Sequence, residues 1–426
     1  MIKFIINKFF KFTKSRSDPT QKILLTLLVL FIFRFGNTIP LEGIDQEALK
    51  KSFLQLESRN QIMQVINMYS GGGGMTLLSP FSLGIIPFIN ASILVDLLTA
   101  LFPTLEKLQS EEGEVGRRKI LFYKKLLTLI FSIGQSIFLI FYLKSYFYNS
   151  SFFNFSIITL QLVAGAMIIV WLSNIIDNKG IGNGTSLIIF TNIIVTLISK
   201  NLFKFEGINS ILILQISFLL FLMVLICISQ TARINIDVVS ARQLAFLENI
   251  DKNNLSEKFS RNFQVKDNGL SIRLNQAGIF PIIIASNLLP FLSYFIDSIF
   301  GPGTINPFNN FFYYLLIIGF NYFYTIVFWD PEKISEQLRK ASVSLINITP
   351  GKETVSYLEN VVRSSSLLGG FFLCVILFLY DLVKQYLNGP LLNQINISSL
   401  IILVGVAYEI QRTIRSLYKN VLEVTV

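Results

Sequence analysis

The sequence has 426 residues, of which 52% are hydrophobic and only 15% charged, and its mean hydropathy is +0.59. Soluble domains usually carry about a quarter charged residues, so this composition excludes an ordinary soluble protein and points to a lipid environment. The formal net charge is +10, and the chain has no histidine, which removes the commonest general base and the commonest metal ligand.

Ten segments are long and apolar enough to cross a bilayer, for which about 20 residues suffice. The predicted spans are Lys22–Ile39, Pro80–Phe102, Ile120–Leu143, Ile157–Ile176, Thr185–Phe203, Ile211–Ser229, Ala277–Phe300, Phe311–Trp329, Ser364–Tyr386 and Ile397–Thr413.

The basic residues distribute unevenly over the two sides that these spans define. One side, here called the basic side, holds 28 of the 36 Lys and Arg residues, and the opposite side holds seven. Because cytoplasmic loops are enriched in Lys and Arg, this bias predicts that both termini lie in the cytoplasm or stroma. The N-terminus lacks a long transit peptide, so we expect the protein to be made in the compartment where it works.

Four consecutive glycines, Gly71, Gly72, Gly73 and Gly74, stand between a short apolar piece and the second span. Such a run cannot hold a stable helical turn, so it predicts a hinge or loop. A plain flexible loop is one interpretation. The other is a small movable element, about Gln61 to Leu78, which the glycines join to the following span.

Ile85 and Ile89, at the start of the second span, are four residues apart and are predicted to share one helix face. After this span, Glu111–Lys119 changes from acidic to basic and contains two glycines, which predicts a solvated connector.

The segment Gly180-Ile181-Gly182-Asn183-Gly184 opens the fifth span. It superficially matches a dinucleotide fingerprint, but no strand–turn–helix unit surrounds it, so it predicts a flexible, capped helix start instead. Pro350-Gly351-Lys352 fails as a phosphate-binding loop because Glu353 follows the lysine. No cofactor or metal site is predicted.

Taken together, these stretches resemble the SecY family in order and spacing over nearly the whole chain. The matching stretches are Arg34–Pro40, Gly43–Asp45, the glycine run, Leu83–Ser92, Gly113–Lys119, Gly180–Gly184, Leu274–Pro281, Phe328–Pro331 and Pro350-Gly351. Ser240–Leu244 and Leu274-Asn275-Gln276 are most similar to the plastid and cyanobacterial branch.

The resemblance implies an all-α polytopic membrane protein, in which two five-helix halves surround a central pore and residues 61–78 form a short re-entrant plug. The halves would be residues 1–204 and 205–426. A ring of apolar side chains would close the waist of the pore, and on matching positions this pore ring is Ile85, Ile89, Thr185, Ile189, Ile283 and Ile402. Thr185 departs from the aliphatic residue usual in the family. Without the resemblance, each isoleucine would be interpreted as a packing or lipid-facing residue.

The resemblance further implies a lateral gate and a partner surface. Candidate gate residues are Asn90, Ser92, Gln135 and Asn287, with ordinary interhelical contacts as the alternative. Loops 230–276 and 330–363 would bind a ribosome or a SecA-type motor ATPase through Arg233, Arg242, Lys333, Arg339, Lys340 and Lys352. Thr349 stands where the family usually has arginine. The stretch after Gln230, which is basic in the family, is less basic here because it contains Asn235 and Asp237. SecE-type and SecG-type subunits, signal-bearing polypeptides and lipid complete the implied partners.

The predicted function is therefore a passive Sec channel for unfolded polypeptides, not an enzyme, in a plastid thylakoid membrane or, as an alternative, a bacterial inner membrane. Two other classes remain open on the sequence alone. A secondary transporter would need paired charge or an ion ligand near mid-membrane, and a membrane-embedded enzyme would need convergent polar groups within spans.

Overall fold

The structure is a computed structural model that describes residues 19–48, 78–110, 112–148, 151–199, 210–240, 270–275, 277–278, 280–286, 288–289, 309–346, 348–387, 392 and 397–424. Contacts along the chain divide it into two compact units. The first is Met1–Leu212 together with Pro390–Val426, and the second is Ile213–Gly389. The first unit thus includes the C-terminal helix, which packs on helices from the N-terminal part of the chain.

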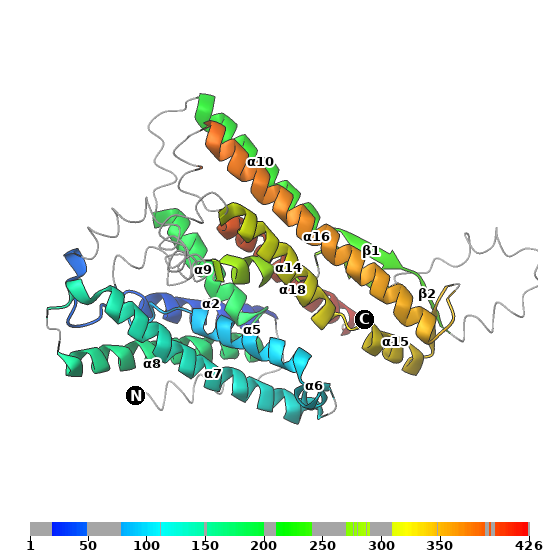
Figure 1. Cartoon of the computed structure of the whole chain (residues 1–426), viewed down its shortest axis with the longest axis horizontal. Helices are drawn as coiled ribbons and strands as arrows, with labels where there is room; N and C mark the ends of the chain where they lie inside the picture. Colours follow the sequence, from blue (N-terminus) through cyan, green and yellow to red (C-terminus); the bar gives the residue numbers. More distant parts are fainter. Residues whose placement is uncertain are drawn as a thin grey trace, which may run out of the picture. The chain divides into compact units, whose positions relative to one another are not determined.

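The regular elements in the described part of the first unit are all helices (Figure 1). Its elements are α2 (Pro19–Gly36), α5 (Ile86–Leu101), α6 (Pro103–Ser110), α7 (Gly113–Tyr142), the 3-10 turn η2 (Lys144–Tyr146), α8 (Phe152–Lys179), α9 (Gly184–Ser199) and α18 (Ile397–Val424).

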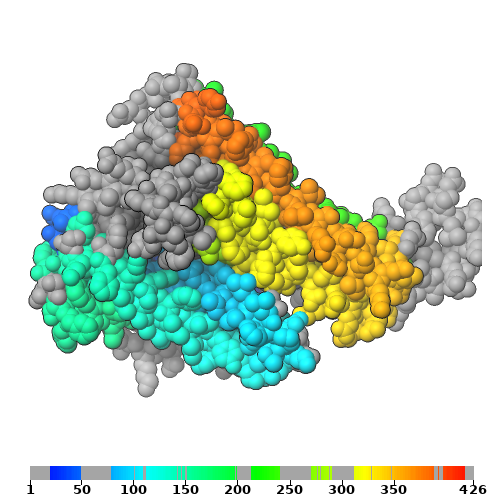
Figure 2. Space-filling view, viewed as in Figure 1, coloured from blue at the N-terminus to red at the C-terminus, as the bar shows by residue number. Residues whose placement is uncertain are grey.

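The second unit begins within α10 and combines helices with two small antiparallel sheets. Its elements are α10 (Ser210–Thr231), β1 (Arg233–Ile236), β2 (Val238–Ser240), β3 (Leu270–Arg273), α14 (Asn309–Phe328), α15 (Pro331–Lys340), β4 (Val343–Leu345) and α16 (Lys352–Leu387). Figure 2 shows α14, α15 and α16, in yellow to orange, as one continuous surface.

Six helices of the described part are long and apolar enough to cross a membrane, and two more are apolar but shorter. The six are Gly113–Phe141, Phe152–Lys179, Ile213–Thr231, Phe311–Lys340, Lys352–Leu387 and Ile397–Leu417, and the shorter two are Ile86–Thr99 and Gly184–Thr196. All eight overlap predicted spans, although some extend beyond the predicted ends. Their lipid-facing character is visible in the many large apolar side chains that remain exposed, such as Phe141 and Phe371.

The prediction of a solvated connector at Glu111–Lys119 is wrong from Gly113 onward, because the residues from Gly113 form the first turns of α7. Their side chains are exposed, as predicted, but acidic Glu114 in the first turn favours a helix N-terminus. Gly116 lets α6 approach, since a Cβ there would strike the backbone carbonyl of Leu108. Polarity alone does not distinguish such an exposed helical end from a loop.

A charged pair joins α5 to α7 near the basic side. Asp96 Oδ1 lies 2.9 Å from Lys124 Nζ, and the two side chains are only 24% and 17% exposed. Asp96 lies near the end of the predicted span Pro80–Phe102. The pairing explains why both helices tolerate a charge there, because each group is neutralised by the other.

Removing either partner of this pair is expected to destabilise the protein by about 2 kcal/mol, between the values for surface and buried pairs. Asp96→Ala and Lys124→Ala should each lower the melting temperature of the purified protein, and the double variant should recover part of the loss. The exposed Arg118–Glu114 pair, at 3.5 Å, is the matched control. Equal effects of Asp96→Ala and Glu114→Ala would contradict an energetic role for the α5–α7 pair.

Candidate functional site

Ile85 and Ile89 of the predicted pore ring lie at the start of α5 and share one helix face, as predicted. The amide of Ile89 donates to the carbonyl of Ile85 at 3.1 Å, so the two side chains are one turn apart. Both side chains are buried, Ile85 completely. Pro87, within the first turn, fixes the backbone for a helix start at this point.

A short turn segment, residues 78–85, leads into α5 and is here called the elbow. Its hydrogen bonds are local: Ser79 N donates to Ser82 Oγ at 2.8 Å, and Gly84 N donates to Phe81 O at 2.9 Å. Gly84 has φ +59°, a conformation that favours glycine. The predicted second span therefore becomes helical only at Ile86. The elbow determines the position of Ile85, its last residue.

The elbow packs closely against two glycines of other helices. A Cβ on Gly165 of α8 would strike the carbonyl oxygen of Pro80, and one on Gly36 of α2 would strike the ring of Phe81. That ring also stacks on Phe33 of α2, with centroids 6.2 Å apart. The elbow is thus wedged between α2 and α8 at positions where only a hydrogen atom fits.

Gln46 clamps the first residue of the elbow. Leu78 N donates to Gln46 Oε1 at 2.9 Å, and Gln46 Nε2 donates to the carbonyls of Leu78 and Leu41, each at 3.3 Å. Leu41 N also donates to Leu78 O at 2.7 Å. One glutamine side chain therefore ties the backbone at Leu41 to the backbone at Leu78, 37 residues later in the sequence.

Leu78 itself is 1% exposed and belongs to an apolar core. The core collects side chains from the chain after α2, from the elbow and from α7 and α8, among them Leu41, Ile44, Ile140 and Leu162. A single β-bridge between Ile44 and Phe147 joins the segment after α2 to the segment after α7. Both segments are predicted on the side opposite the basic side, so their contact agrees with the alternation of the spans.

The predicted capped start of the fifth span is confirmed. Asn183 Oδ1 accepts from the amide of Thr185 at 3.0 Å and from its hydroxyl at 2.6 Å, and Asp177 Oδ1 accepts from Gly184 N at 2.7 Å. Gly182 has φ +76°, and a Cβ on Gly184 would strike the carbonyl of Ser173. The Thr185 hydroxyl therefore uses its proton in a hydrogen bond to the capping residue Asn183. This bond reduces the polarity of the threonine side chain toward its other neighbours.

The loop before this helix is also fixed to α2. Ile181 N donates to Thr26 Oγ1 at 3.1 Å, while the same hydroxyl donates to Lys22 O at 2.7 Å. A Cβ on Gly180 would come within 2.8 Å of Thr26 Oγ1, so glycine is required for this approach. Thr26 thus anchors the α8–α9 loop, a role that no motif in the sequence indicated.

The other pore-ring residues are also buried. Ile189 lies on α9 and Ile402 on α18, two helices that pack on each other within the first unit. Ile283 lies in the helical residues 280–286 of the second unit and is buried there. Five of the six ring positions thus belong to the first unit, on α9, on α18 and at the start of α5.

Three predicted gate residues are described, and all three are half-buried: Asn90 and Ser92 on α5, and Gln135 on α7, which packs against α5. Asn287 lies outside the described residues. So do Gly71 to Gly74, Arg242 and all of the predicted plug except Leu78.

The two predicted partner loops meet in a folded platform of the second unit. β1 pairs with β3 within loop 230–276, and β2 of the same loop pairs with β4 of loop 330–363. Beneath the strands lies an apolar core that includes Ile236, Ile272, Leu345 and Leu358. The sequence did not indicate these strands, because each is only three or four residues long and pairs with a distant partner.

Five of the predicted docking residues lie on this platform and are exposed: Arg233, Lys333, Arg339, Lys340 and Lys352. Lys333 pairs with Asp330 at 3.2 Å and Lys340 with Glu336 at 3.0 Å, which reduces the positive charge that they present. Thr349, at the position where the family usually has arginine, donates to Glu353 Oε2 at 2.6 Å. This threonine therefore contributes to the start of α16 instead of adding a positive charge.

The spans, the apolar cores and the basic platform define an all-α polytopic membrane protein. A family model described as SecY matches residues 79–411. A protein translocase subunit SecY from Pyropia yezoensis is 35% identical over 416 residues, covering 94% of this chain and 96% of the relative. The corresponding protein of Synechocystis is 33% identical, with 93% and 91% covered. The chain belongs to the SecY family, in a plastid and cyanobacterial-like branch.

Solved structures share the fold. One described as the structure of a protein-conducting channel has a TM-score of 0.64 at 14% identity and covers 93% of this chain and 92% of its own. Sec61 in a canine ribosome–channel complex has a TM-score of 0.60 at 15% identity, with 93% and 92% covered. These likenesses confirm the predicted fold class.

Proposed function

We propose that this chain is the central channel subunit of a Sec protein translocase, which conducts unfolded polypeptides across the membrane and releases apolar segments sideways into lipid. The observation that carries this proposal is the SecY family match over residues 79–411. As a member of a channel family the chain is not an enzyme, and family membership also decides against a secondary transporter.

In this proposal the pore ring seals the channel. Apolar side chains around a narrow waist block ions by dewetting when the channel is empty, and they can yield around a passing chain. The buried state of Ile85, Ile89 and Ile402 supports this assignment. Residues 61–78 would act as the plug, with Gly71 to Gly74 as its hinge, and the energy for transport would come from a partner.

The platform of the second unit would bind that partner, either a ribosome or a SecA-type motor. Its exposed cations, such as Arg339 and Lys352, suit an anionic surface, and its strands hold both loops in one place. SecE-type and SecG-type subunits would complete the complex. The chain would lie in a thylakoid membrane, with both termini on the stromal side because the basic loops lie there.

Site-specific crosslinking tests the channel assignment. Photo-reactive residues replacing Ile89 and Ile283 are expected to crosslink to the mature part of a stalled, signal-bearing chain. Phe138, which is exposed on α7, is the matched control and should crosslink to lipid instead. If Ile89 and Ile283 give no crosslinks in the folded complex with its partners present, these residues do not line a polypeptide path.

A further inference from the structure

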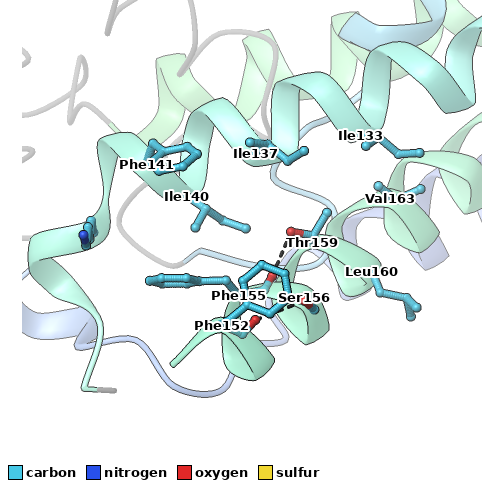
Figure 3. A pocket seen from close by; sticks show the side chains of 11 residues that line it. Ile133, Ile137, Ile140, Phe141, Phe152, Phe155, Ser156, Thr159, Leu160 and Val163 are labelled. Carbon is cyan, nitrogen blue, oxygen red and sulfur yellow. Dashed lines mark hydrogen bonds between the residues drawn. The ribbon is translucent and has the colours of Figure 1, made fainter. Parts of the chain in front are cut away.

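An apolar groove runs along the outside of the first unit, between α7 and α8 (Figure 3). It has a volume of about 540 Å³. Isoleucines of α7, such as Ile133 and Ile137, line one wall, and side chains of α8, such as Phe152 and Leu160, line the other. Most of the lining side chains are exposed, Phe152 to 85%, so the groove opens outward and not into the core.

The groove has little polar character to offer a water-soluble ligand. Its two hydroxyl groups are already used, because Ser156 Oγ donates to Phe152 O at 3.0 Å and Thr159 Oγ1 donates to Phe155 O at 2.8 Å. These bonds satisfy the hydroxyl protons within α8, which leaves a dry, largely hydrocarbon surface. An apolar chain fits this surface better than a polar molecule does.

The length of the groove corresponds to one leaflet of a bilayer. On α8 it extends from Phe152 to Val163, and at 1.5 Å per residue this is about 16 Å. The hydrocarbon core of a bilayer is about 30 Å thick, so the groove covers about half of it. A membrane-spanning partner helix would need the full thickness, whereas a lipid chain occupies one leaflet.

Lys144 is the charged residue among the eleven that line the groove. It lies three residues beyond Phe141, where the α7 span ends. It is one of only seven basic residues predicted on the side opposite the basic side. The enrichment of Lys and Arg in cytoplasmic loops does not explain a lysine on this side. Within the described residues it forms no ion pair.

We infer that the groove between α7 and α8 binds one acyl chain of an anionic lipid, in the leaflet opposite the basic side, with the headgroup beside Lys144 Nζ. The apolar walls select a hydrocarbon chain, and the lone cation selects a negative headgroup over a zwitterionic one. None of the residues that line the groove belongs to the pore ring or to the partner platform.

Quenching by brominated lipids tests this site in vesicles that contain the full-length channel. A fluorescent amino acid replaces Leu160 at the rim, and quenching by brominated phosphatidylglycerol is compared with quenching by brominated phosphatidylcholine. The expected relative affinity favours the anionic lipid about five-fold, which is the contribution of one cation near a headgroup. Lys144→Ala should reduce the ratio to about one, while Lys144→Arg should retain it.

Two controls make the result specific. Lys125→Ala removes an exposed cation in the N-terminal half of α7 and should leave the ratio unchanged. The same fluorophore at Phe138, which is exposed on α7 but does not line the groove, should show no preference. Equal ratios at both positions would show only general lipid contact and overturn the inference. So would a preference that survives Lys144→Ala, or an absence of quenching by either lipid at Leu160, which would mean that protein covers the groove.

Discussion

Gly165→Ala is expected to destabilise the protein, although alanine is normally the better helix former. Replacing glycine by alanine inside a helix contributes about 1 kcal/mol of stability by itself. At Gly165 the new Cβ would strike the carbonyl oxygen of Pro80, which is backbone and cannot rotate away. Overpacking of this kind costs about 1–3 kcal/mol, and the elbow would have to move off α8.

Gly134→Ala is the matched control, because Gly134 also lies inside a helix, α7, but has open space where its Cβ would be. The melting temperature of the purified protein should rise for Gly134→Ala and fall for Gly165→Ala. The elbow leads directly into Ile85, so Gly165→Ala should also increase ion conductance of the resting channel in bilayers. Equal melting temperatures for the two variants would contradict the close contact between α8 and the elbow.

Gln46→Leu is expected to release the start of the elbow while the volume of the side chain is nearly kept. The substitution removes three hydrogen bonds, and it leaves the amide of the buried Leu78 without its acceptor. An unsatisfied buried donor costs about 1–3 kcal/mol. Hydrogen exchange at the Leu78 amide should accelerate by one to two orders of magnitude, roughly as this energy implies.

Gln46→Glu and Glu47→Gln are control variants. They distinguish loss of the hydrogen bonds made by Gln46 from a general effect of substitutions in this segment. Glutamate at position 46 keeps an acceptor for the Leu78 amide but loses both donated bonds, so an intermediate exchange rate is expected. Glu47 is exposed and its side chain lies outside the clamp, so Glu47→Gln should behave as the wild type. If Leu78 exchanges at the wild-type rate in Gln46→Leu, then the backbone bond from Leu41 alone holds the elbow.

The spans could be predicted from the sequence because their signal is local. About 20 consecutive apolar residues identify a membrane helix without knowledge of its neighbours. The same holds for the start of α9, where Asn183, between Gly182 and Gly184, indicated a capped helix that the structure confirms. At Gly113 the local signal was ambiguous, since a charged helical end and a charged loop have the same composition.

Contacts between distant parts of the chain could not be predicted in this way. The Gln46 clamp depends on Leu78 returning to the end of α2, and the pair of Asp96 with Lys124 depends on how α5 packs on α7. The platform strands are equally non-local, because β2 finds its partner β4 about a hundred residues later in the sequence. The residues of the pore ring were named from family resemblance, and their joint role at a pore stays a prediction.

The ladder between β1 and β3 has a practical consequence for engineering the protein. Arg233 faces Arg273 and Ile236 faces Leu270, so two stretches more than thirty residues apart in the sequence are held about 5 Å apart. The length of the sequence between them can therefore change without moving α10 or the strands. A compact reporter domain inserted near position 255, with its own termini close together, would be carried by the channel without disturbing its spans.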